Sequence, residues 1–114
     1  MILLELKDIN DLNNVCIEIN KINDLAGVYG CFEVINGEEN CFYIGKSDSI
    51  RERLLDVFDA NMYIFEKSKK SILSDNKVLV KLLVRVLKNN GTFQGVDNLS
   101  EVVVKTNKKS VFIL

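Results

Sequence analysis

The sequence contains no histidine, no proline and no tryptophan. Without histidine, the chain lacks both the commonest general base and the commonest zinc ligand of proteins. Its three cysteines, Cys16, Cys31 and Cys41, are an odd number and lack the paired spacing of a metal site. They indicate reduced thiols in a cytoplasmic protein rather than a disulfide framework.

Long apolar runs are also missing, since none approaches the roughly 20 residues that a membrane helix requires. The first residues lack a basic region followed by a sustained apolar stretch, which argues against a signal peptide. No internal repeat, low-complexity tract or flexible linker divides the chain. Of its 114 residues, 47% are hydrophobic and 27% are charged, so we expect one globular domain over residues 1–114, with no membrane contact.

The formal net charge of −1 hides an uneven distribution of charge along the sequence. Residues 1–40 hold eight acidic and two basic side chains, whereas residues 67–114 hold ten basic and three acidic ones. The near-neutral total argues against strong nonspecific binding to DNA, because phosphate contacts supply most of that affinity. The basic second half leaves two interpretations open, a local phosphate-binding surface and an ordinary solvated one.

Two short strands are predicted near the middle of the chain. Side chains alternate over residues 27–34, and residues 41–45 form a second short apolar segment. The Asn36-Gly37 pair between them is typical of an antiparallel hairpin. The next segment is predicted to be a helix, with apolar residues at helical spacing and a capping box formed by Ser49 and Glu52.

The other segments complete the predicted fold. Residues 8–25 favour a short helix or strand, and residues 59–75 favour a loop or broken helix. Residues 76–90 place Val and Leu side chains along one helical face, which predicts an amphipathic helix. Residues 101–105 and 110–114 predict a second hairpin. We therefore expect an α/β (α+β) fold, with a small antiparallel sheet of three to five strands flanked by helices.

Two three-residue motifs lie in the two strands of the predicted hairpin. Gly-Val-Tyr occupies residues 27–29, Tyr-Ile-Gly occupies residues 43–45, and Arg53 follows eight residues later. This arrangement resembles the signature of the GIY-YIG nuclease superfamily, with valine in place of the first isoleucine. The resemblance covers about residues 26–58, and it implies a compact α/β nuclease domain.

The resemblance also implies an activity, the metal-dependent hydrolysis of phosphodiester bonds in DNA by an endonuclease. Tyr29 is then the base or water-orienting group, and Tyr43 is its partner across the hairpin. Arg53 stabilises phosphate charge through its planar fork of donors. Lys46 adds positive charge near the scissile group.

The same residues have plain structural interpretations as well. The two tyrosines form a cross-strand aromatic pair in that case. The arginine becomes a surface side chain that pairs with Glu52 or Asp56. Gly27 and Gly45 become ordinary strand-end glycines, whereas the resemblance implies that Gly45 lets the strand turn closely into the helix.

A divalent metal, Mg²⁺ or Mn²⁺, is implied together with a downstream glutamate that holds it. Glu101 lies at about the expected distance, but the three valines after it favour a strand rather than a helix. Glu66 is an earlier alternative. Val57 occupies the place where many members carry a histidine. Because Mg²⁺ binds poorly without carboxylate ligands, loss of catalysis on a retained scaffold is the alternative.

Three functions therefore remain open. The first is the DNA endonuclease, and the second is an inactive relative that binds nucleic acid or inhibits another protein, for instance in conflict between phage and host. That relative is expected to form a protein complex or a homodimer through its terminal strand or acidic surface. The third is an unrelated α/β domain with a chance motif. Phosphate contacts are expected from two basic groups: Lys67, Lys69 and Lys70, and the helical stripe Lys77, Lys81, Arg85 and Lys88.

Overall fold

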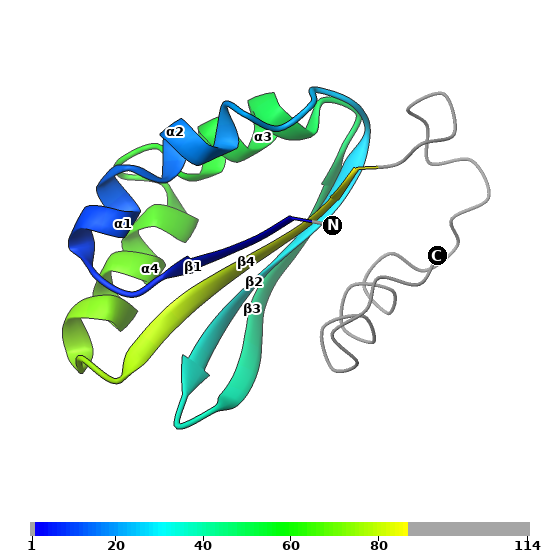
Figure 1. Cartoon of the computed structure of the whole chain (residues 1–114). Helices are drawn as coiled ribbons and strands as arrows, with labels where there is room; N and C mark the ends of the chain where they lie inside the picture. Colours follow the sequence, from blue (N-terminus) through cyan, green and yellow to red (C-terminus); the bar gives the residue numbers. More distant parts are fainter. Residues whose placement is uncertain (1, 87–114) are drawn as a thin grey trace.

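A four-stranded antiparallel sheet covered on one face by four helices forms the described part of the chain (Figure 1). The computed structural model describes residues 2–86. The elements in chain order are β1 (Ile2–Leu6), α1 (Ile9–Asn13), α2 (Val15–Ile19), β2 (Gly27–Ile35), β3 (Glu38–Ser47), α3 (Ile50–Val57), α4 (Tyr63–Ser74) and β4 (Val78–Val86). The strand order is β1-β4-β2-β3. The α+β class predicted from the sequence is confirmed.

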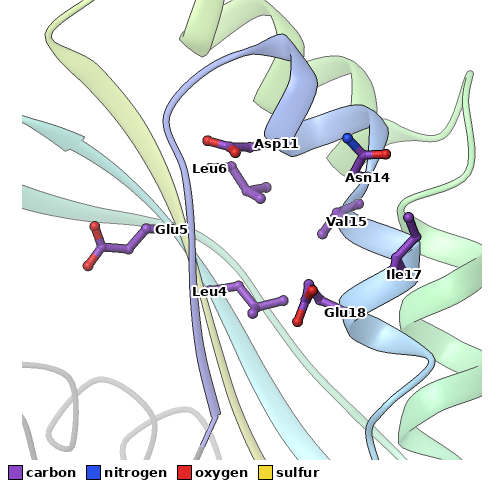
Figure 2. A pocket seen from close by; sticks show the side chains of 8 residues that line it. All are labelled: Leu4, Glu5, Leu6, Asp11, Asn14, Val15, Ile17 and Glu18. Atoms are coloured by element: carbon purple, nitrogen blue, oxygen red, sulfur yellow. The ribbon is translucent and has the colours of Figure 1, made fainter.

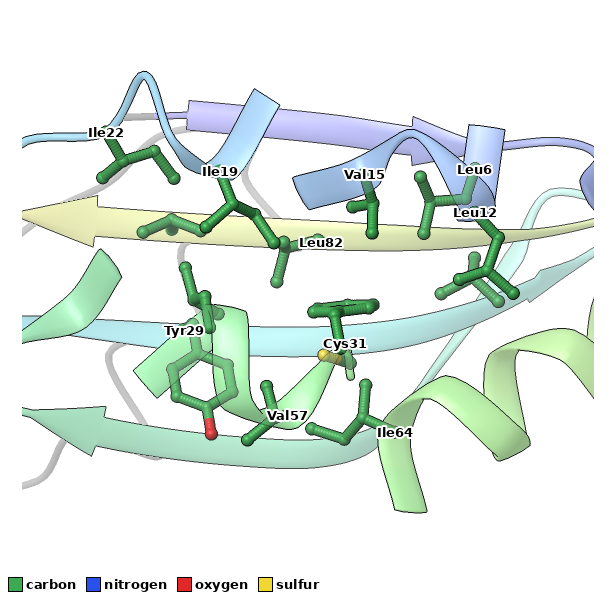
Figure 3. Close-up of a cluster of buried hydrophobic side chains, with 14 of the residues drawn as sticks. Leu6, Leu12, Val15, Ile19, Ile22, Tyr29, Cys31, Val57, Ile64 and Leu82 are labelled. Carbon is green, nitrogen blue, oxygen red and sulfur yellow. The ribbon is translucent and has the colours of Figure 1, made fainter. Parts of the chain in front are cut away.

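Strand β2 is buried on both of its faces. Tyr29 and Cys31 point toward the helices and belong to the main core (Figure 3). Val28 and Phe32 point the other way and form a smaller cluster with Leu83 of β4. This division follows the alternation of side chains along a strand, so the period of two predicted for residues 27–34 is confirmed.

The predicted hairpin is formed by β2 and β3. Asn36 and Gly37 at its tip have φ angles of 53° and 78°. Two successive residues with positive φ are typical of a type I′ turn, whose twist matches that of the flanking strands. A bulge makes Cys31 pair with Tyr43 while Phe32 pairs with Cys41. Because paired residues share a face, Tyr43 lies on the helix-covered face with Cys31.

The prediction of a helix over residues 76–90 is wrong. Val78–Val86 form β4, which pairs with β1 on one side and with β2 on the other. The helix-covered face of β4 is apolar and its opposite face mixes leucine with Lys81 and Arg85, so its run of Val and Leu also fits helical spacing. The four valines among its nine residues favour the strand, and pairing with two neighbours decides the outcome.

A continuous helix, α4, replaces the loop or broken helix predicted for residues 59–75. Its buried positions are Ile64, Ser68, Ser71 and Ile72, at helical spacing. Serines at two of these four positions hide the apolar periodicity in the sequence. The segment 8–25 contains the short helices α1 and α2, and β1 was not predicted.

The capping box predicted for Ser49 and Glu52 is also wrong. Ser49 precedes α3 but its side chain accepts no capping hydrogen bond. Instead, the Oδ1 atom of Asp24 accepts hydrogen bonds from the backbone amides of Arg51 (3.2 Å) and Glu52 (3.5 Å). A carboxylate at this end also suits the positive end of the helix dipole. Asp24 therefore ties the loop before β2 to the start of α3.

None of the helices in residues 2–86 is long and apolar enough to cross a membrane. The predicted second hairpin at residues 101–105 and 110–114 lies outside the described residues.

Candidate functional site

Tyr29 and Tyr43 meet on the helix-covered face of the hairpin. Their ring centroids are 5.9 Å apart with an interplanar angle of 20°, which is a stacked pair. Tyr29 is buried, with 1% of its surface exposed, whereas Tyr43 is 38% exposed. Figure 3 shows the Tyr29 ring extending from β2 so that its hydroxyl lies over β3. The two motif tyrosines are therefore brought together, with one of them open to solvent.

Gly45 makes room for the buried tyrosine. It pairs with Tyr29 across the hairpin, and a Cβ atom at this position would lie 2.5 Å from both Cζ and Oη of Tyr29. No ordinary contact is that short, so only glycine allows the ring to lie flat over β3 here. At the start of β2, a Cβ on Gly27 would lie 2.8 Å from the carbonyl oxygen of Arg85 and 3.0 Å from Ile50. At both motif glycines, therefore, another part of the protein lies too close to the backbone for a larger residue.

Arg53 lies on an exposed part of α3, the helix that follows the hairpin. Its positive charge acts on the Tyr29 hydroxyl and lowers the pKa of that group, against stronger opposing effects. The ion pairs of α3 within residues 2–86 belong to its neighbour Arg51, which lies 3.9 Å from both Asp24 and Glu52. The predicted pairing of Arg53 with Glu52 or Asp56 is therefore wrong, and its guanidinium has no ion-pair partner among residues 2–86.

The Tyr29 hydroxyl is held in its protonated form. Burial raises its pKa well above the ordinary value of 10.0, and the neighbouring Tyr43 adds to the shift through charge repulsion and a side-chain hydrogen bond. A group in this state donates a hydrogen bond at neutral pH but does not act as a base. Tyr29 is thus suited to orienting the Tyr43 hydroxyl, with which it shares a hydrogen bond.

Stability at alkaline pH is expected to depend on Tyr29. The folded state holds this proton more tightly than the unfolded chain, so the free energy of unfolding falls as pH rises above about 10, by up to ~1.4 kcal/mol per pH unit. Denaturant titrations between about pH 8 and pH 11 should show a shallower decline for Tyr29→Phe than for the natural protein.

The exposed Tyr63 provides the control for this experiment, and Tyr63→Phe should keep the steep decline. Burial also raises the pKa of the Cys31 thiol from its ordinary value of 9.0. Cys31 therefore contributes to the loss of stability at high pH, and it does so equally in both variants. Parallel curves for Tyr29→Phe and the natural protein would contradict the protonated, buried state of Tyr29.

Lys46 and the basic residues of β4 lie away from the tyrosine pair. Lys46 pairs with Val28, whose side chain lies on the opposite face of the sheet, so its role beside the scissile group stays a prediction. Lys81 and Arg85 share this opposite face with Leu83 because strand side chains alternate. Lys81 bonds to Glu39 and lies 5.9 Å above the Phe32 ring.

The predicted stripe of four basic residues on one helix face is not formed, because its helix is a strand. Lys77 is an exposed residue just before β4, and Lys88 lies outside the described residues. The second predicted basic group, Lys67, Lys69 and Lys70, lies on α4, on the same side of the sheet as the tyrosines.

Glu33 and Tyr63 were not singled out in the sequence. Glu33 of β2 accepts a hydrogen bond from the Ser71 hydroxyl and lies 3.7 Å from the Lys67 ammonium, which fixes α4 on the sheet. Tyr63, at the start of α4, contacts Tyr43 with a centroid distance of 6.4 Å. Only the tertiary contact of α4 with the hairpin reveals these roles.

A separate cavity of about 210 Å³ lies between β1 and the helices α1 and α2, and it is lined partly by acidic residues (Figure 2). Asp11 accepts hydrogen bonds from the backbone amides of Lys7 (2.8 Å) and Asp8 (3.3 Å), which directly precede α1. Glu18 pairs with Lys21 at 3.0 Å, and Glu5 lies 3.9 Å from Lys7. Each of these carboxylates already has a partner nearby, so they do not form a set of ligands for a metal ion.

Comparisons with family models, with curated proteins and with solved structures found no match for this chain. The resemblance to the GIY-YIG superfamily therefore rests on the motif residues of the sequence alone.

Proposed function

We propose that this protein is an endonuclease of the GIY-YIG type that hydrolyses phosphodiester bonds in DNA. The observation that supports the proposal is the stacked pair of Tyr29 and Tyr43, on which the charge of Arg53 acts. Arg53 itself forms no ion pair with the residues that the structure describes. A tyrosine pair with one ring open to solvent, and a guanidinium near enough to act on it, suit a phosphate group, whose charge grows as the bond to the leaving oxygen breaks.

Each residue of this group has a distinct part in the proposed reaction. Arg53 binds two phosphate oxygens through its planar fork and stabilises the charge that develops on them. Tyr29 is buried, and its protonated hydroxyl orients the Tyr43 hydroxyl through their hydrogen bond. Tyr43 is half-exposed, so it is the member of the pair that water and substrate can reach. The pair therefore orients water rather than removing its proton.

The divalent metal implied by the resemblance does not fit the described residues. Within residues 2–86, no group of three or more Asp, Glu, Cys or His side chains is arranged to hold a metal ion. Glu66, the alternative ligand, lies exposed on α4 beside Lys67 and Lys70. Glu101, the ligand expected from spacing, lies outside the described residues, so no step of the reaction is assigned to a metal here.

The second candidate function is a binding protein that keeps the scaffold without cleaving DNA. Val57 favours it, because this residue is buried in the main core at the position where many members place a histidine. Within residues 2–86, no three acidic or cysteine side chains are grouped so that they could hold a metal ion, which points in the same direction. Such a protein would bind the phosphates of DNA at this site without hydrolysing the phosphodiester bond.

Incubation of the purified full-length chain with supercoiled plasmid and with labelled oligonucleotides tests the proposal. Parallel reactions contain Mg²⁺, Mn²⁺ or EDTA, and gels report nicked, linear and shortened products. We expect cleavage in at least one cation condition and none in EDTA. DNA that stays intact throughout, while it still binds the protein in an Arg53-dependent manner, would replace the endonuclease by the second candidate.

A further inference from the structure

The tyrosine pair continues into a row of three rings that leads from the core to the surface. Tyr63 of α4 lies beside Tyr43, with ring centroids 6.4 Å apart and planes tilted by 47°. The exposed fraction rises along the row, from buried Tyr29 through Tyr43 to Tyr63, which is 61% exposed. Tyr63 thus presents an aromatic surface to solvent next to the proposed phosphate site.

A basic groove begins at the same ring. This cavity of about 520 Å³ runs along α4 and is lined by Tyr63, Glu66, Lys67, Lys69, Lys70 and Leu73. Its lining holds three lysines against one glutamate, so its charge suits a polyanion. Lys67 is held at the inner edge by Glu33, at 3.7 Å, and also lies 5.9 Å above the Phe42 ring. Lys69 and Lys70 are exposed along the rest of the groove.

We propose that Tyr63 stacks on an unpaired base beside the phosphate held by Arg53, and that the lysines of α4 contact the adjoining backbone. The substrate class is then single-stranded DNA or a locally unpaired nucleotide. This inference deepens the proposed function and rests on its placement of the scissile phosphate. The faces of paired bases are covered within a duplex, so an exposed ring can stack only on a base that is unpaired or turned out. Stacking tolerates any base, which suits an aromatic platform without side chains for reading sequence.

Binding measured in EDTA separates this inference from catalysis. The probe is a single-stranded thymidine oligonucleotide of about 16 nucleotides, compared with an abasic strand of equal length and with a duplex. We expect Tyr63→Leu to weaken binding to the thymidine strand by roughly 5- to 150-fold, and to leave binding to the abasic strand unchanged. Tyr63→Phe should restore binding because the ring is retained. Because Tyr63 is largely exposed, thermal melting should confirm that both variants fold.

Salt dependence tests the lysines. Lys69→Gln and Lys70→Gln should each flatten the dependence of binding on salt concentration, because each removes about one phosphate contact. Lys21→Gln, on an exposed residue after α2, is the matched charge control and should keep the slope.

The possible results distinguish the two proposals. Equal binding of the thymidine strand by Tyr63→Leu and the natural protein would overturn the stacking platform, and tighter binding of the duplex would overturn the substrate class. Tyr63-dependent binding without any cleavage would keep the platform and reject the endonuclease. Cleavage that Tyr63→Leu leaves unchanged would keep the endonuclease and reject the stacking platform. Binding of neither nucleic acid would overturn this inference and leave the groove to a protein partner.

Discussion

Arg53→Ala is expected to lower the rate of DNA cleavage by roughly 10²- to 10⁴-fold, with little change in thermal stability. The Arg53 side chain is exposed and forms no ion pair within residues 2–86, so the fold does not depend on it. Its guanidinium is the cation that acts on the tyrosine pair, so its loss leaves the developing phosphate charge without a fixed positive partner. Single-turnover cleavage with saturating protein measures the loss in the chemical step.

Arg51 on the same helix offers a matched control, since it is bound to Asp24 and Glu52 at the start of α3. Arg51→Gln should retain cleavage and lose at most about 1 kcal/mol of stability, because these ion pairs are partly exposed. Arg53→Lys should recover only part of the rate, since lysine keeps the charge but not the paired donors. A similar loss of cleavage in Arg51→Gln and Arg53→Ala would reject the role assigned to Arg53.

The parts of this fold that the sequence predicted are those decided by local chemistry. The prediction of the hairpin is confirmed, because Asn and Gly readily adopt positive φ angles and both residues have them in the structure. The convergence of Tyr29 and Tyr43 follows from that hairpin and from the bulge that keeps Tyr43 on the helix-covered face. The α+β class was predictable because local sequence patterns indicate both strands and helices.

Other features depend on partners far away in the chain. The carboxylate that caps α3 belongs to Asp24, 27 residues before Arg51, and no local pattern reveals it. β4 also fits the spacing of a helix in the sequence, and only its pairing with β1 and β2, which are distant in the chain, makes this segment a strand. Lys46 was placed in the site because the sequence shows its proximity to the motif but not the face of the sheet that carries its side chain. Tyr63 was missed because only the docking of α4 brings it to Tyr43.

Gly45→Ala is expected to damage both the fold and the site. The new methyl group would lie 2.5 Å from the hydroxyl oxygen of Tyr29 and 2.6 Å from Cε1, well inside contact distance. Tyr29 is buried among core side chains and has little space to move, so overpacking should cost roughly 1–3 kcal/mol. For a domain of this size, that corresponds to a fall in melting temperature of roughly 4–20 °C.

The same displacement should reduce cleavage by about 10²-fold even where the protein stays folded, because a shift near 1 Å at reacting groups costs that much. A double-mutant cycle identifies the contact responsible. In a Tyr29→Leu background the ring that the methyl group would strike is absent, so Gly45→Ala should cost much less stability than it does alone. Equal costs in the two backgrounds would mean that Gly45 serves something other than the approach of the Tyr29 ring, and the proposed geometry of the tyrosine pair would then be wrong.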